Sequence, residues 1–84
     1  MEEILSVEHF NEIKQKGIGY IAITDHILPV NRVHEVLCGD VSVKHFHKKV
    51  IESGRKNGKY YFVEDYFEAL DKFHKMQRCS KCLP

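Results

Sequence analysis

Apolar residues near the start of the chain recur at helical spacing. Val7, Phe10 and Ile13 lie three residues apart, which places their side chains on one face of a helix. Ser6 precedes them and belongs to a residue type that caps helix N-termini, while Gly17 is typical of the position just after a helix end. The pattern therefore predicts a first helix between Ser6 and Gly17.

The segment that follows predicts a strand and then a second helix. Residues 20–24 are rich in Tyr and Ile, which indicates a buried strand. Pro29 would lie in the first turn of the next helix, where its missing N–H costs little. The apolar stripe that predicts this second helix consists of Val30, Val33, Val36 and Leu37.

The second half of the chain predicts the same three elements again. Ser42 would cap a third helix, whose inward-facing residues are Val43, Phe46 and Val50. Residues 60–63 predict a second strand. A fourth helix follows, with apolar residues at positions i, i+3, i+4 and i+7. These are Tyr66, Ala69, Leu70 and Phe73.

The two halves also share residues, which indicates an internal repeat. The sequence Ser-Val-Glu-His-Phe at residues 6–10 returns as Ser-Val-Lys-His-Phe at residues 42–46. In the same way His34 corresponds to His74. A repeat of this length is one supersecondary unit used twice. The two copies and a tail without periodicity span residues 5–37, 41–77 and 78–84 of a single domain, residues 1–84.

These patterns predict an α+β domain with pseudo-two-fold symmetry, in which helix, strand and helix occur twice. Backbone groups of a buried strand need hydrogen-bond partners, so two lone strands should pair with each other. We therefore expect residues 20–24 and 60–63 to form a two-stranded antiparallel pair packed with four helices. Phe10 and Phe46 should occupy equivalent environments. The predicted core consists of Phe10, Ile21, Ile23, Val33, Phe46, Phe62, Leu70 and Phe73.

Composition limits the class of protein. The 84 residues make one domain at most, and a hydrophobic share of 43% fits a folded globule. No apolar run approaches the ~20 residues of a membrane span, and Glu2 and Glu3 stand where a secretory signal would be basic. Three cysteines are an odd number, which argues against a complete disulfide framework. We therefore expect a cytoplasmic protein with thiols that are free or metal-bound.

The cysteines carry the strongest local chemical signal. Cys79 and Cys82 are two residues apart, a spacing at which two thiolates can bind one Zn²⁺ ion, and a structural zinc site needs four ligands. Cys38 would be the third ligand and His74 the fourth, with His34 as the alternative histidine. The other interpretation is a frayed tail with two unpaired thiols and Cys38 as a small core residue.

Charge is distributed unevenly between the two halves of the chain. Residues 1–42 carry seven acidic and three basic side chains, and residues 43–84 carry five acidic and ten basic ones, so the net charges are −4 and +5. This asymmetry suggests a polyanion or an acidic partner for the second half, and attraction between the halves is the alternative. The candidate nucleic-acid contacts are Lys44, His45, Lys48, Arg55, Lys56 and Lys59.

The predicted order between residues 31 and 73 is a helix, a tight turn, a second helix, a basic hairpin-like segment and a closing helix. These elements are residues 33–37, 39–42, 43–48, 53–62 and 64–70. The order resembles the small winged helix-turn-helix modules of excisionase and MerR-type proteins. The resemblance implies that Lys44 and His45 face a DNA groove while the remaining cations neutralise phosphates.

The leading hypothesis is a small intracellular DNA-binding accessory or regulatory protein. A non-enzymatic protein-interaction module, such as a small inhibitor or adaptor of a larger partner, is the alternative, because a compact repeat with segregated charge also suits that role. The sequence contains no P-loop, nucleophile elbow or pair of catalytic carboxylates. We therefore expect no enzymatic activity and no membrane partner, with Zn²⁺ as the candidate cofactor.

Overall fold

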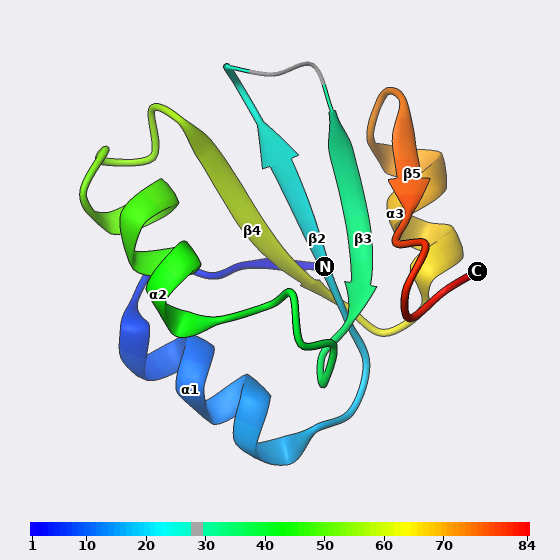
Figure 1. The fold of residues 1–84 in the computed structure, drawn as a ribbon, viewed down its shortest axis with the longest axis horizontal. Coiled ribbons are helices and arrows are strands. Elements are labelled where there is room, and N and C mark those ends of the chain that lie inside the picture. The colour runs from blue at the N-terminus through cyan, green and yellow to red at the C-terminus, as the bar shows by residue number, and fades with distance from the viewer. Residues whose placement is uncertain (28–29) are drawn as a thin grey trace.

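A mixed sheet of five strands forms the centre of the domain in the computed structural model, which describes residues 1–27 and 30–84. The strand order is β1-β4-β2-β3-β5 (Figure 1). The elements along the chain are β1 (Glu2–Glu3), α1 (Val7–Lys16), β2 (Tyr20–Asp25), β3 (Asn31–Glu35), α2 (Val43–Phe46), η1 (His47–Ile51), β4 (Gly58–Val63), α3 (Tyr66–Lys72) and β5 (Met76–Arg78). Because α2 and η1 are consecutive, they form one helix whose second part is π-helical.

β2 and β4 form the antiparallel pair that the sequence predicts. Their register places Tyr20 opposite Val63 and Asp25 opposite Gly58. β1 pairs antiparallel with β4, β3 pairs antiparallel with β2, and β5 pairs in parallel with β3. The α+β class is therefore confirmed, but the two-stranded sheet and the four helices are wrong: the described residues form five strands and three helices.

The predicted second helix is a strand. Residues 31–35 form β3, which turns back along β2 and places Glu35 opposite Tyr20. A β-branched residue such as Val33 suits a strand at least as well as a helix, and the open edge of β2 offers hydrogen-bond partners that a lone helix would leave unused. Pro29, expected in the first turn of that helix, lies outside the described residues.

The junction between the second copy and the tail also differs from expectation, because Met76–Arg78 form a strand that joins the sheet. In β5 only Met76 is buried, while Gln77 and Arg78 are exposed. The parallel register places Asn31 opposite Met76 and Val33 opposite Arg78. A strand of three residues with one buried side chain has no period to detect, so its partner rather than its own sequence determines its structure.

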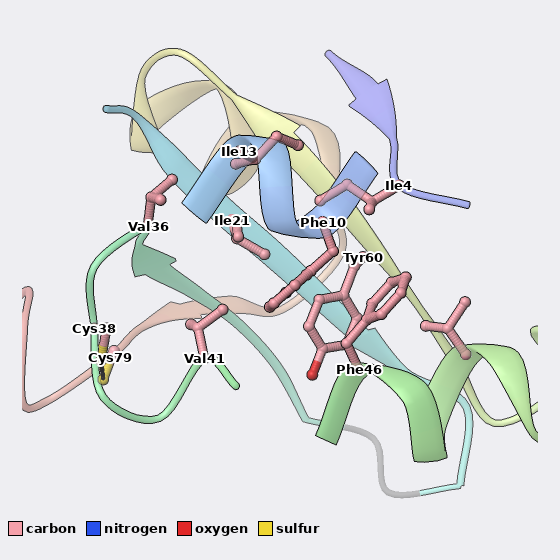
Figure 2. Close-up of a cluster of buried hydrophobic side chains, with 11 residues drawn as sticks. Ile4, Phe10, Ile13, Ile21, Val36, Cys38, Val41, Phe46, Tyr60 and Cys79 are labelled. Atoms are coloured by element: carbon pink, nitrogen blue, oxygen red, sulfur yellow. Dashed lines mark hydrogen bonds between the residues drawn. The ribbon is translucent and has the colours of Figure 1, made fainter. Parts of the chain in front are cut away.

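Helices cover both faces of the sheet, with α1 and the α2–η1 helix on one face and α3 on the other (Figure 1). Phe10 of α1 and Phe46 of α2 stack with ring centroids 4.9 Å apart, and both rings contact Tyr60 of β4 (Figure 2). This is the larger core. The smaller core beneath α3 consists of Ala22, Val33, Val63, Ala69 and Met76.

The expected core residues divide into two groups. Four are fully buried, and the others are partly buried where they pack against the two cores. The buried group consists of Phe10, Ile21, Val33 and Phe46. The partly buried group consists of Ile23, Phe62, Leu70 and Phe73.

The helix ends follow the predicted caps. The Ser6 hydroxyl accepts a hydrogen bond from the His9 N–H at 3.1 Å, and the Ser42 hydroxyl accepts one from the His45 N–H at 3.2 Å. Gly17 ends α1 with φ = 67°, a left-handed conformation that glycine adopts without steric cost. Local sequence therefore determines where these helices begin and end, and the strands position the site described next.

Candidate metal centre

Two segments far apart in the sequence bring four potential metal ligands together. β3 provides His34, and the turn that follows provides Cys38, whose N–H donates to the Glu35 carbonyl at 3.0 Å. The chain leaves β5 at Cys79, whose N–H donates to the Val33 carbonyl at 3.0 Å. The parallel pairing of β5 with β3 therefore carries the C-x-x-C segment to the end of β3.

The ligand atoms converge closely enough for a single ion. One ligand atom from each of His34, Cys38, Cys79 and Cys82 lies within 4.8 Å of all the others. The sulfur atoms of Cys38 and Cys79 are 4.0 Å apart and lie side by side in Figure 2. Two thiolates bound tetrahedrally to one zinc ion at ~2.3 Å would be about 3.8 Å apart. All three cysteines are free, and a disulfide would need ~2.05 Å between sulfurs.

The cluster is largely shielded from solvent. His34, Cys38 and Cys79 are buried and Cys82 is half-buried. Nδ1 of His34 is buried and has no hydrogen-bond partner among the described residues. A buried polar atom without a partner costs roughly 1–3 kcal/mol. A cation held by the cluster could provide the partner that Nδ1 of His34 lacks.

Backbone N–H groups surround the sulfur atoms, as is suitable for thiolates. The Glu35 N–H donates to Sγ of Cys82 at 3.2 Å. The pKa of the Cys79 thiol is lower than usual. Burial is the largest single influence and raises this pKa. Hydrogen bonds from the backbone N–H groups of Cys82 and Lys81 and from the neighbouring thiols together outweigh it. Burial raises the pKa of Cys82 to about 12. A bound cation would allow all the thiols to ionise together.

The histidine is held in the form that binds metals. Burial is the main cause that lowers the pKa of His34, and the Asp40 carboxylate opposes it only in part. A lowered pKa keeps the imidazole neutral near pH 7, and a neutral imidazole has a lone pair available for coordination.

A lysine from α1 approaches the cluster from outside. Lys14 Nζ donates to the carbonyl of Val36 at 2.6 Å and to that of Cys38 at 3.5 Å. Three thiolates, one neutral imidazole and a divalent ion have a formal charge of −1, which a lysine at this position offsets. Sequence reasoning missed Lys14, because the contact depends on where α1 crosses the turn after β3 and no local pattern encodes that crossing.

The structure gathers all three predicted cysteine ligands, and the histidine of the cluster is His34 rather than His74. His74 is exposed in the turn before β5, where its carbonyl accepts a hydrogen bond from Nδ2 of Asn31 at 2.9 Å. Asn31 begins β3, whereas Cys38 follows the end of that strand. The parallel register thus places His74 at one end of β3 and the cluster at the other.

The candidate nucleic-acid contacts lie on the α2–η1 helix and along the segment that leads into and through β4. Arg55 pairs with Glu3 at 3.7 Å, and Lys59 is half-buried in β4. Residues 33–37, expected as the first helix of a winged module, form the end of β3 and the turn after it. Four of the contacts are exposed and form no ion pair within the described residues: Lys44, His45, Lys48 and Lys56.

No protein-family model, curated protein or solved structure matches this chain. Among the described residues, every helix is too short or too polar to cross a membrane. The geometry of the chain itself must therefore carry any inference about its function.

Proposed function

We propose that this chain is a small non-catalytic domain that binds one Zn²⁺ ion through His34, Cys38, Cys79 and Cys82 and uses it to fix its fold. The proposal rests on the convergence of four ligand atoms within 4.8 Å of one another. Thiolate and imidazole ligands favour Zn²⁺ over Mg²⁺ or Ca²⁺, which prefer oxygen. Four side-chain ligands also fill a tetrahedral shell, whereas catalytic zinc sites keep one position open for water or substrate.

The position of the cluster supports a structural role for the ion. Cys38 and Cys79 are 41 residues apart in the sequence, so one ion would join the turn after β3 to the segment after β5. A domain of this size buries a modest share of its surface and is marginally stable by itself. An ion that binds only the folded chain adds its binding free energy to stability.

Metal analysis tests this proposal directly. Protein purified without chelator should contain one zinc per chain, and replacement of zinc by Co²⁺ should give the intense visible absorption of tetrahedral thiolate coordination. Cys82→Ser, which removes the most exposed ligand, should weaken both signals. Well under one zinc per chain, or the faint spectrum of octahedral cobalt, would contradict the proposal.

A second proposal is that exposed side chains of the α2–η1 helix and of the segment before β4 bind nucleic acid. Its support is the set of exposed side chains without ion pairs in the described residues, Lys44, His45, Lys48 and Lys56. The three lysines of this set are available to neutralise phosphates, and each phosphate contact adds about one unit to the salt dependence of binding.

A gel shift on random duplex DNA at low salt tests this second proposal. Lys48→Ala combined with Lys56→Ala should weaken binding at every sequence and flatten the salt slope by roughly two. The matched control is Lys16→Ala combined with Lys72→Ala, which removes the same charge from the last turns of α1 and α3. Absence of binding at micromolar protein, or equal loss in both double variants, would contradict it.

A further inference from the structure

The α2–η1 helix covers only part of its face of the sheet. The helix packs against β4 and leaves the outer ends of β2 and β3 uncovered beside it (Figure 1). A groove of about 650 Å³ lies there, between the helix and the β2–β3 hairpin. This volume is within the range of roughly 300–1,000 Å³ that small-molecule sites occupy.

Apolar side chains line the groove between the helix and the hairpin. Ile23 and the buried Tyr60 come from two neighbouring strands of the sheet, β2 and β4. Ile27 and Val30, on the two sides of the hairpin connection, also line the groove and are 68% and 41% exposed. Exposed apolar side chains on a concave surface favour an occupant with an apolar body.

The carboxylates that line the groove are already paired. Asp25 accepts a hydrogen bond from Lys49 Nζ at 2.6 Å, and Asp40 accepts one from Lys81 Nζ at 3.1 Å. Each carboxylate charge is therefore offset by a lysine of the protein itself. These two pairs leave no net charge for an occupant to compensate.

The unpaired charges of the groove are positive. Arg32 of β3 and Lys48 of η1 line the groove from the hairpin and from the helix, and both are exposed. Within the described part of the chain, neither forms an ion pair. His45 of α2 adds a hydrogen-bonding group on the same side as Lys48. An arginine fork suits the planar oxygen pair of a carboxylate or phosphate, and a lysine adds a point charge.

We infer that this groove binds a small organic anion with an apolar body. Arg32 and Lys48 hold its carboxylate or phosphate head, and its body lies against Ile23 and Tyr60. The site shares only a border with the metal cluster, through His34, and requires neither metal chemistry nor nucleic acid. It shares Lys48 and His45 with the candidate nucleic-acid contacts but proposes a different class of ligand, so it extends beyond both functions proposed above.

Three probes with one ring system test the chemistry of the occupant. ¹⁵N-labelled protein is titrated with 1-naphthyl phosphate, 1-naphthoate and neutral 1-naphthol, and amide shifts are followed by NMR. Both anions should saturate one site, shift the amides of Ile23, Arg32 and Lys48, and bind roughly tenfold or more tightly than naphthol. The tighter of the two anions assigns the head group as phosphate or carboxylate.

Paired variants test the assignment of the cations. Arg32→Gln combined with Lys48→Gln should weaken both anions roughly tenfold or more and change naphthol binding by less than about twofold. Lys16→Gln combined with Lys72→Gln removes the same charge outside the groove and should leave all three affinities unchanged. Anions that bind no tighter than naphthol, equal losses in the two double variants, or shifts that map outside the groove would overturn the inference.

Discussion

Two histidines at equivalent positions of the sequence repeat have different surroundings. His34 is buried in β3, and its Nδ1 has no partner among the described residues. His74 is exposed in a turn, where its carbonyl rather than its ring forms a hydrogen bond to Asn31. Equivalence in the repeat therefore does not imply an equivalent role, because the element after each repeated strand differs.

Substitution of each histidine should separate these roles. His34→Ala should lower zinc affinity by more than roughly a hundredfold, since loss of outer-shell partners alone costs 10–100-fold. His34→Cys should retain one zinc because four thiolates also form a structural site. His74→Ala, the matched control, should change zinc affinity little. Competition with a chromophoric chelator measures all three, and loss of zinc in His74→Ala alone would refute the assignment.

Tyr60 should make the domain sensitive to alkali. Burial raises the pKa of Tyr60 from 10.0 to about 12, so the folded state favours the protonated phenol. The resulting stabilisation is fully present below pH 10 and is lost as pH rises from 10 to about 12. The shift of about two units corresponds to roughly 2–3 kcal/mol.

Comparison with Tyr60→Phe isolates this titration from that of the lysines and the other tyrosines. Urea unfolding at several values of pH between 9 and 12 gives the free energy of unfolding of both proteins, with the pH range set by the ordinary and raised pKa values. The wild-type protein should lose more stability than the variant across that interval. Parallel curves for the two proteins would show that Tyr60 does not titrate in this way.

At the scale of elements, the sequence predicts those parts that local chemistry determines. The caps Ser6 and Ser42 and the helices they begin are confirmed, since residue type and spacing specify them. The β2–β4 pair is also confirmed, and it was predicted because two buried strands need hydrogen-bond partners. β3 was predicted as a helix because Val30, Val33, Val36 and Leu37 satisfy a spacing of three and four. The pairing of residues 31–35 with β2, a tertiary contact, overrides that pattern.

The candidate site shows the same division between local and long-range information. The C-x-x-C spacing identifies Cys79 and Cys82 from the sequence alone. Cys38 follows as a candidate ligand because it is the third of the three cysteines in the sequence. The choice between His34 and His74 depends on β5, a strand of three residues whose parallel pairing with β3 no local pattern reveals. Where a residue's position depends on such a long-range pairing, the sequence alone does not show which residues it will contact.

Removal of the metal should loosen β5 before the rest of the sheet. β5 has three residues and is held by β3, one buried methionine and the cysteine cluster, whereas β2 and β4 pair along six residues each. After chelation, hydrogen exchange at the amides of Cys79 and Leu83 should accelerate by roughly tenfold or more beyond the acceleration at Ile21 and Phe62, which open only when the whole sheet opens. Equal acceleration at all four amides would mean that β5 opens only together with the rest of the sheet.

At the scale of the whole molecule, the cysteine cluster and the larger core are continuous. Cys38 and Cys79 belong to the same buried group as Phe10 and Phe46 (Figure 2). Coordination of the sulfurs and packing of the aromatic rings should therefore stabilise the same folded state. An ion at this position would contribute to the stability of the domain as well as to that of the segment after β5.

Stability should consequently depend on the concentration of free zinc. Above the dissociation constant, each tenfold rise in free zinc should add about 1.4 kcal/mol to the free energy of unfolding, until unfolded chains also bind the ion. Guanidinium unfolding in zinc buffers measures this as a rising midpoint at constant m-value. Cys82→Ser should give a much flatter dependence. A midpoint that does not move with zinc in the wild-type protein would contradict the coupling.

The parallel pairing of β5 with β3 has a consequence for biosynthesis. Cys38 and Cys79 are 41 residues apart, so a ribosome that adds about 5–20 residues per second makes the second roughly 2–8 s after the first. During that interval one edge of β3 has no partner, and an open strand edge can pair with another chain. The proposed metal centre would close only after translation has passed Cys82. The zinc supply at that moment would then influence whether a nascent chain completes its sheet or associates with a neighbour.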